Sequence, residues 1–266
     1  MHNADTSRFK MVFDSTPLND GLYFFLQLIH RLYPEDAFHY VIAMAIKEKK
    51  TDEEIYKEVQ KNLPEIKPFL QKLTFIAPQQ RRLKKEMQKQ TLQILSGAGV
   101  INGSIQVGGA GNYLSGIKKQ LQLKGNIVFI DDTGNSLKDI IQENNRTPNE
   151  SVDLVACYTG LHHYPEEYLV DFVNFIGRVL RKGGMFIMRE YDVKTAPMQT
   201  FVSVVHSVIS ISENKSWVMD AKEYRVFRPL EEWVNIVTAY GFEDTGKRIT
   251  QHKDPTNNTM MAFRKM

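Results

Sequence analysis

Hydrophobic residues are spaced differently in the two parts of the chain. Up to residue 96 they recur mainly at helical spacing, between short stretches that contain proline or polar residues. Beyond residue 97 they form short continuous runs, which are typical of strands buried on both faces. The pattern therefore predicts a helical region over 1–96, expected to cover the site or recognise a substrate, and an α/β domain over 97–266.

Each part is predicted to hold several elements. Thr51 and Glu54 have the spacing of a capping box, in which each residue bonds the backbone of the other at the start of a helix. In the first part we expect an extended arm over 1–18 and helices over 21–33, 37–47, 51–62 and 79–95. In the second part we expect strands at 105–107, 127–130, 152–157 and 185–188, helices at 113–123, 136–142, 172–180 and 197–211, and a terminal antiparallel hairpin from 246–250 and 258–265.

A glycine cluster follows the first predicted strand. Gly108, Gly109 and Gly111 come directly after Val107, and a helical pattern begins at Tyr113. Glycine permits positive φ and close approach of the backbone to a ligand, and the first N–H groups of a helix are free to bind one. The segment favours a nucleotide-like ligand, with an ordinary tight turn as the alternative.

Two aspartates end the second predicted strand. A carboxylate at this position can accept hydrogen bonds from both ribose hydroxyls of an adenosine. Asp131 and Asp132 both qualify, and we favour Asp131 because Asp132 can cap the next helix. A dinucleotide fingerprint, G-x-G-x-x-G, is excluded because Leu114 or Ala110 stands where glycine is needed.

These segments resemble class I S-adenosylmethionine (SAM) dependent methyltransferases. The first motif, I-Q-V-G-G-A-G-N, departs from the family pattern at three positions, where Gln106 replaces the usual acid and Ala110 and Asn112 replace glycines. The strand over 152–157 leads into a loop ending in L-H-H, the R-K-G-G turn follows, and the segment over 228–242 resembles the late family helix with its W…G-F pattern. The terminal hairpin also distinguishes methyltransferases from dinucleotide-binding domains.

The resemblance implies a doubly wound, mostly parallel sheet with a C-terminal antiparallel hairpin, in which the usual third strand is missing. It also implies SAM as the cofactor and a methyl acceptor with an oxygen, nitrogen or carbon nucleophile. The residues implied for cofactor binding are Gln106, Gly108, Gly109, Gly111, Asp131, Asp132 and Tyr158. Arg189, Glu190, Tyr191 and His206 are candidates for the substrate site.

His162 and His163 are the catalytic candidates. A neutral imidazole can take the proton of an attacking hydroxyl or amine, although methyl transfer needs chiefly positioning, so packing is the alternative role for either ring. Adjacent histidines project in different directions and no second pair stands at zinc spacing, so no metal site is predicted.

Composition restricts the partners and the location. The 266 residues carry a formal charge of +3 with a pI near 8.7, too mild to indicate a nucleic acid, so a small molecule is the favoured substrate. The basic stretch over 81–89 keeps an RNA methyltransferase as an alternative. The single cysteine, Cys157, fits a reducing compartment, and with neither a membrane span nor a secretion signal we expect a cytoplasmic protein.

Two other classes remain as rivals. One is a methyltransferase-like protein that binds a ligand or partner without turnover, because the first motif departs from the family pattern. The other, a nicotinamide-dependent oxidoreductase, is disfavoured because the chain lacks both the dinucleotide fingerprint and a Tyr-x-x-x-Lys pair. The oligomeric state is left open.

Overall fold

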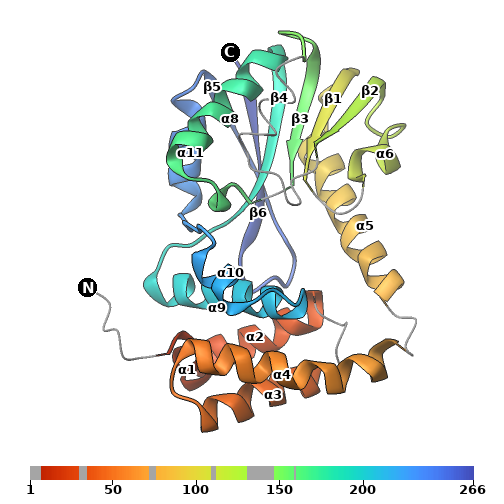
Figure 1. Cartoon of the computed structure of the whole chain (residues 1–266). Coiled ribbons are helices and arrows are strands. Elements are labelled where there is room, and N and C mark those ends of the chain that lie inside the picture. The colour runs from red at the N-terminus through yellow and green to blue at the C-terminus, as the bar shows by residue number, and fades with distance from the viewer. Residues whose placement is uncertain (1–6, 30–34, 72–75, 109–111, 131–146, 159) are drawn as a thin grey trace. The chain divides into compact units, whose positions relative to one another are not determined.

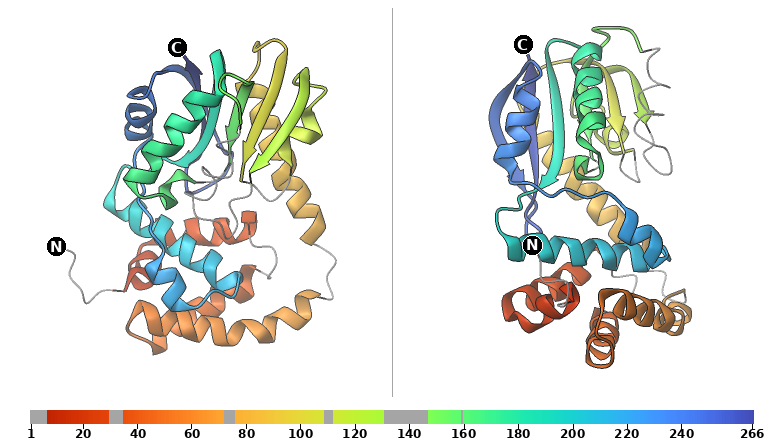
Figure 2. Two further views of the ribbon diagram at one scale, coloured as in Figure 1. Left: turned by 45° about the horizontal axis from the view of Figure 1, so that its top comes forward. Right: turned by 60° about the vertical axis from the view of Figure 1, so that its left-hand side comes forward.

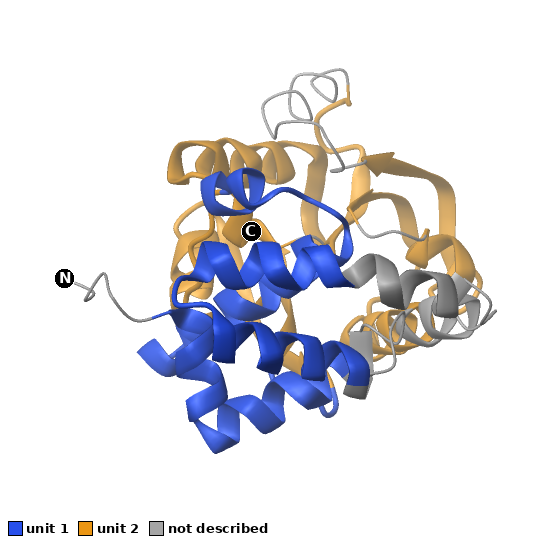
Figure 3. Cartoon of the chain, turned by 60° about the horizontal axis from the view of Figure 1, so that its bottom comes forward, with its two compact units in different colours: residues 1–81, 193–223, 252–257 blue, residues 82–192, 224–251, 258–266 orange. Residues whose placement is uncertain are grey.

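The structure is a computed structural model, which describes residues 7–29, 35–71, 76–108, 112–130, 147–158 and 160–266 (Figure 1). It divides into two compact units (Figure 3). The helical unit comprises 1–81, 193–223 and 252–257, and the sheet unit comprises 82–192, 224–251 and 258–266. The domain boundary predicted between residues 96 and 97 stays a prediction.

The helical unit is built around large buried side chains. Phe9, Phe25, Phe38, Tyr56 and Phe201 are each at most 1% exposed. A hydrogen bond of 2.8 Å from the Tyr56 hydroxyl to the backbone carbonyl of Lys215 adds a polar contact within the unit. The helices with residues in this unit are α1 (Arg8–Asp14), α2 (Thr16–Ile29), α3 (Glu35–Glu48), α4 (Asp52–Gln71), the first turns of α5 (Ile76–Ile94), α9 (Ala196–Ser212) and α10 (Trp217–Lys222).

The start of α4 has the predicted capping box. The Thr51 hydroxyl accepts the N–H of Glu54 at 3.2 Å, and the Glu54 carboxylate accepts the N–H of Thr51 at 3.0 Å. The extended arm predicted for 1–18 is wrong, because α1 begins at Arg8 and α2 at Thr16. Asp52 holds the first of these helices, since its carboxylate accepts the Ser7 hydroxyl at 2.6 Å and pairs with Arg8 at 2.6 Å.

The sheet unit contains one six-stranded sheet with the order β2-β1-β3-β4-β6-β5. The first four strands are parallel, β6 is antiparallel to β4, and β5 is antiparallel to β6, which confirms the predicted fold class and the terminal hairpin. Among the described residues, no further strand pairs with the outer edge of β2. The strands are β1 (Ile101–Val107), β2 (Leu123–Ile130), β3 (Val152–Cys157), β4 (Leu180–Tyr191), β5 (Phe242–Thr250) and β6 (Asn258–Lys265).

Helices cover both faces of the sheet (Figures 1 and 2). Side chains alternate between the faces along each strand, so Val155 and Cys157 of β3 lie in one core cluster while Leu154 and Ala156 lie in the other. The first cluster packs against α8 (Glu166–Val179) and α11 (Leu230–Thr238), and the second against the C-terminal part of α5 and against α6 (Tyr113–Ile117). This double coverage explains the apolar run of β3, whereas β2, predicted as a strand buried on both faces, has Val128 and Phe129 exposed.

The helix predicted over 113–123 is shorter than expected. α6 ends at Ile117, Gln122 has a φ of +48°, and β2 already begins at Leu123. Leu121 and Leu123 are buried in the same cluster as α6, so their helical spacing reflects burial in a turn and a strand. The helix predicted over 136–142 lies outside the described residues. In the described part of the chain, no helix is long and apolar enough to cross a membrane.

Candidate functional site

The strand order reverses at β1. The chain passes from β1 to β2 on one side and returns to β3 on the other, and ligands of open α/β sheets bind at the carboxyl ends of strands where the order reverses in this way. β1 ends at Val107 and is followed by Gly108, β3 ends at Cys157 and is followed by Tyr158, and β4 ends at Tyr191. The predicted site residues that the structure describes in the sheet unit lie at these strand ends.

Gly108 and Gln106 shape the turn after β1. Gly108 has a φ of +63°, a left-handed conformation that favours glycine, and its N–H donates to the carbonyl of Ile130 at 2.9 Å. The Gln106 amide donates to the Gly108 carbonyl at 3.1 Å and accepts the N–H of Leu114 at 3.1 Å. The buried amide thus ties the turn to the start of α6.

Several predicted cofactor residues cannot be placed. Gly109, Gly111, Asp131 and Asp132 lie outside the described residues, as does Ala110 of the first motif. The prediction of free N–H groups at the next helix is wrong for Leu114, whose N–H is taken by the Gln106 side chain. The roles of the others stay predictions.

Tyr158 lies at the end of β3 and packs against Tyr113. The two ring centroids are 4.9 Å apart in an edge-to-face arrangement, and the N–H of Tyr158 donates to the carbonyl of Val107 at 3.0 Å. The Tyr158 hydroxyl shares a hydrogen bond of 2.7 Å with Thr91 of α5. Burial raises the pKa of both phenols, so both rings are neutral hydrogen-bonding groups.

His162 is bound on two sides by Glu190. Both residues are buried, with 4% and 1% of their surfaces exposed, and the His162 Nδ1 lies 2.8 Å from the Glu190 Oε2. The backbone N–H of His162 donates to the Glu190 Oε1 at 3.2 Å. The sheet brings these residues together, because the short helix η1 (Leu161–His163) follows β3, and Glu190 lies near the end of the neighbouring strand β4.

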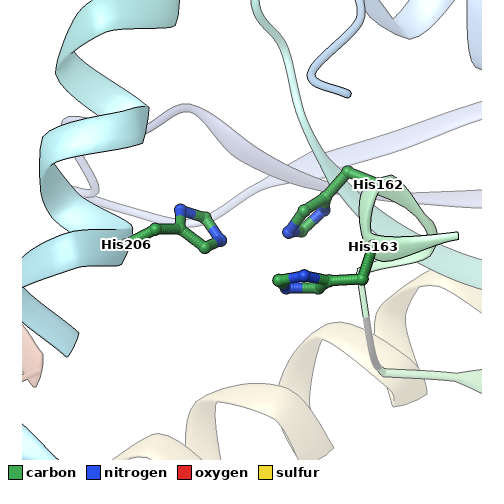
Figure 4. Close-up of side chains that lie close together, drawn as sticks. All are labelled: His162, His163 and His206. Atoms are coloured by element: carbon green, nitrogen blue, oxygen red, sulfur yellow. The ribbon is translucent and has the colours of Figure 1, made fainter. Parts of the chain in front are cut away.

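Aromatic rings surround this pair. The ring centroid of His162 lies 4.2 Å from His163, 5.1 Å from Tyr191 and 5.1 Å from Phe227. Figure 4 shows His162 and His163 projecting from η1. Phe227 also packs edge-to-face against Tyr191, with centroids 5.9 Å apart. The imidazole–carboxylate pair therefore lies against the aromatic rings of Tyr191 and Phe227.

The other substrate candidates are held differently. Arg189 donates a hydrogen bond to the Gln251 side chain, and because side chains alternate along a strand it points to the opposite face from Glu190. His206 lies on α9 of the helical unit (Figure 4). Its Nδ1 is 2.9 Å from the carbonyl oxygen of Val202. Their roles in substrate binding stay predictions.

Sequence reasoning missed two residues of this site. Gly160 precedes η1, and a Cβ added there would overlap the Cε1 and Nδ1 atoms of His162. The only feature of the sequence that could have indicated this role is that Gly160 stands two residues before His162. Phe227 follows the helical unit's α10 in the sequence, and nothing in the local pattern indicates its contact with His162.

Comparison with known proteins gives a match to one family. Residues 109–188 match the family described as "Methyltransferase domain", a span that begins in the glycine turn and ends in β4. No curated protein matches the chain.

Several solved structures are similar to the chain. 1,6-Didemethyltoxoflavin-N1-methyltransferase from Burkholderia thailandensis, solved with 1,6-didemethyltoxoflavin and S-adenosylhomocysteine, is 13% identical, with 69% of this chain and 79% of that chain covered and a TM-score of 0.48. The N-methyltransferase NodS from Bradyrhizobium japonicum, solved with S-adenosylhomocysteine, is 14% identical, with 68% and 86% covered and a TM-score of 0.44. A SAM-dependent methyltransferase from Archaeoglobus fulgidus is 9% identical, with 70% and 94% covered and a TM-score of 0.47.

These structural likenesses are distant, so the assignment depends on the matched span, on the strand order and on the motifs of the sequence. The mostly parallel sheet with its antiparallel terminal hairpin is the arrangement that the motifs imply. Residues 109–188 of the sheet unit match the methyltransferase domain family, and the strand order of this unit is the one that the resemblance to class I SAM-dependent methyltransferases implies.

Proposed function

We propose that this methyltransferase transfers the methyl group of SAM to an oxygen, nitrogen or carbon nucleophile of a small molecule. The observation that carries the proposal is the buried pair of His162 and Glu190 at the strand ends, enclosed by Tyr191 and Phe227. Aromatic side chains with few polar groups among them are typical of sites for small ligands. We further propose that the protein acts in the cytoplasm, which its single buried cysteine, Cys157, supports.

SAM supplies an electrophilic methyl group on a sulfonium, and displacement at that carbon needs little beyond alignment. Holding two reactants in line contributes on the order of 7–11 kcal/mol. In our proposal the turn at Gly108 lies beneath the methionine moiety, and Tyr158 or Tyr113 presents a ring to the sulfonium. A cation over an aromatic ring is stabilised by about 0.5–2 kcal/mol.

The ribose contact is tested by two neighbouring substitutions. We expect Asp131→Ala to weaken SAM binding roughly tenfold or more, because charge-assisted hydrogen bonds contribute about 1.5–3 kcal/mol each. Asp132→Ala is the matched control and should leave the dissociation constant within about threefold of the wild-type value, a change below 1 kcal/mol. Calorimetric titration measures both, and the reverse order of effects would assign the ribose to Asp132 instead.

The acceptor is found by screening. The purified chain is incubated with SAM and with pools of hydroxylated, amino and heterocyclic compounds, and S-adenosylhomocysteine is measured by mass spectrometry. We expect acceptor-dependent product with at least one pool. SAM binding without product in any pool would favour the alternative of a methyltransferase-like protein that binds without turnover.

RNA is the second candidate substrate, and a charge asymmetry favours it. The segment over 81–130 holds eight basic residues and one acid, Glu86, whereas the whole chain has a net charge of only +3. Lys85, Lys89, Lys118 and Lys119 are exposed on α5 and at the end of α6. Clustered lysines of this kind neutralise phosphates without reading bases.

Salt dependence separates the two candidates. For a small-molecule enzyme we expect only weak RNA binding, lost at moderate salt. An RNA enzyme that neutralises several phosphates would bind with a slope of log affinity against log salt near −0.7 per contact on single strands. Filter binding of structured RNA at several salt concentrations makes the measurement, and submicromolar affinity with a steep slope would contradict the small-molecule proposal.

A further inference from the structure

The backbone and the ring of His162 both make hydrogen bonds with residues that are distant in the sequence. The Glu190 carboxylate accepts the His162 backbone N–H at 3.2 Å and faces its Nδ1 at 2.8 Å. On the other side, the N–H of Val226 donates to the His162 carbonyl at 2.8 Å. Because Nδ1 faces the carboxylate, Nε2 is the ring nitrogen directed away from it.

Gly160 provides the space that the ring occupies. A Cβ there would overlap the Cε1 and Nδ1 atoms of His162, so alanine would displace the imidazole. The backbone does not demand glycine, since Gly160 has a φ of −68° and a ψ of 117°, which other residues adopt readily. The requirement for glycine therefore comes from the position of the ring.

The electrostatics of the pair follow from its burial. Burial raises the pKa of the Glu190 carboxyl to about 8, against the opposing effect of the backbone N–H groups of Leu161 and His162 and of the nearby His163. Groups this close titrate as a pair. In the sheet unit, the titratable side chains of His163 on η1 and Tyr191 on β4 lie against the His162 ring, as does the uncharged ring of Phe227.

The Glu190 carboxyl, whose pKa burial raises to about 8, and the His162 imidazole bind protons as one pair, so this pair can take up a proton around neutral pH. It still has an unprotonated fraction at neutral pH. General bases work best with a pKa near the operating pH. The geometry and the environment thus both suit proton acceptance.

We propose that Gly160 and Glu190 are positioning residues for His162, which accepts the proton that a hydroxyl or N–H acceptor loses when it is methylated. The inference rests on the proposed methyl transfer and narrows its acceptor to groups that carry a removable proton. The acceptor's lone pair forms the bond to the methyl carbon, and the electrons of the broken carbon–sulfur bond stay on sulfur. The acceptor's proton passes to Nε2 of His162, and the Glu190 carboxylate offsets the charge of the imidazolium.

Histidine NMR tests the coupling without a known acceptor. The full-length chain has seven histidines, so the ring signals can be titrated together and the His162 signal assigned from its loss in His162→Gln. In the wild type we expect the His162 signal to respond to protonation of the neighbouring Glu190 carboxyl, whose pKa burial raises to about 8. In Glu190→Gln the midpoint should fall by about one unit or more, towards or below the free value of about 6.5, because an adjacent carboxylate favours the charged imidazole.

Gly160→Ala gives an independent variant that keeps the carboxylate. We expect it to shift the His162 midpoint away from that of the wild type, because the ring can no longer lie against Glu190. The matched control is Gly177→Ala on α8, where a Cβ would meet Phe242 at an ordinary 3.7 Å, so the wild-type titration should remain. A His162 midpoint that Glu190→Gln leaves unchanged would overturn the inference.

SAM calorimetry on the same samples distinguishes failure of the inference from failure of the proposed function. Absence of SAM binding by the wild type would overturn the function, whatever the histidine titration gives. SAM binding with an uncoupled His162 would overturn the inference alone. Once an acceptor is known, kcat can be measured against pH. In Glu190→Gln the pH range over which kcat rises should move to lower pH. If Glu190 had only a structural role, the substitution would lower kcat without moving that range.

Discussion

Gly108→Val is expected to weaken SAM binding by about 100-fold or more, a loss near 2.7 kcal/mol. Gly108 has a φ of +63°, where a β-branched residue is strongly strained, and it lies in the turn that we place beneath the cofactor. Calorimetric titration with SAM gives the dissociation constant.

Gly183→Val is the matched control for this substitution. Gly183 has a similar φ of +79°, but nothing lies within 4 Å of a Cβ there, and it belongs to the beginning of β4, away from the strand ends that carry the site. The two variants carry similar backbone strain, so only Gly108→Val should lose affinity for SAM. Equal losses in both would attribute the effect to unfolding, and unchanged affinity in Gly108→Val would remove the turn from the site.

Trp233→Ala is expected to lower the free energy of unfolding by about 3–5 kcal/mol, the usual loss for a large aromatic residue in a core. Trp233 is fully buried in the cluster that α8 and α11 form on one face of the sheet. The guanidinium of Arg228 lies 5.1 Å from its ring centroid, and this cation–π contact would be lost as well.

A graded variant makes the test of Trp233 sharper. Within the part of the chain that the structure describes, its indole N–H has no hydrogen-bond acceptor, so Trp233→Phe loses volume but no hydrogen bond and should be clearly less destabilising than Trp233→Ala. Urea unfolding followed by circular dichroism measures both. A loss below about 1 kcal/mol for Trp233→Ala would contradict its place in the core.

The centre of the sheet could be predicted because β3 is buried on both faces and is therefore almost continuously apolar. Val155 and Leu154 face different clusters, yet both are fully buried, and this produces the unbroken run that marks β3. The arm predicted over 1–18 failed for the opposite reason. The start of α1 is held by Asp52, and a contact across more than forty residues leaves no trace in local spacing.

The candidate site was only partly visible in the sequence for the same reason. The L-H-H run and the strand-end position of Glu190 were each visible, but not the 2.8 Å contact that joins His162 to Glu190. Glu190 was predicted as a substrate residue, and the structure shows both of its oxygens engaged by His162. The contact of Phe227 and the space left by Gly160 depend on how the chain folds back, which no local pattern records.

The central claim is that the sheet unit binds SAM for methyl transfer, and calorimetric titration of the purified full-length chain with SAM tests it most directly. We predict saturable binding of one SAM per chain, competed by S-adenosylhomocysteine and weakened by Gly108→Val but not by Gly183→Val. Absence of binding at millimolar SAM by a demonstrably folded protein would contradict the claim.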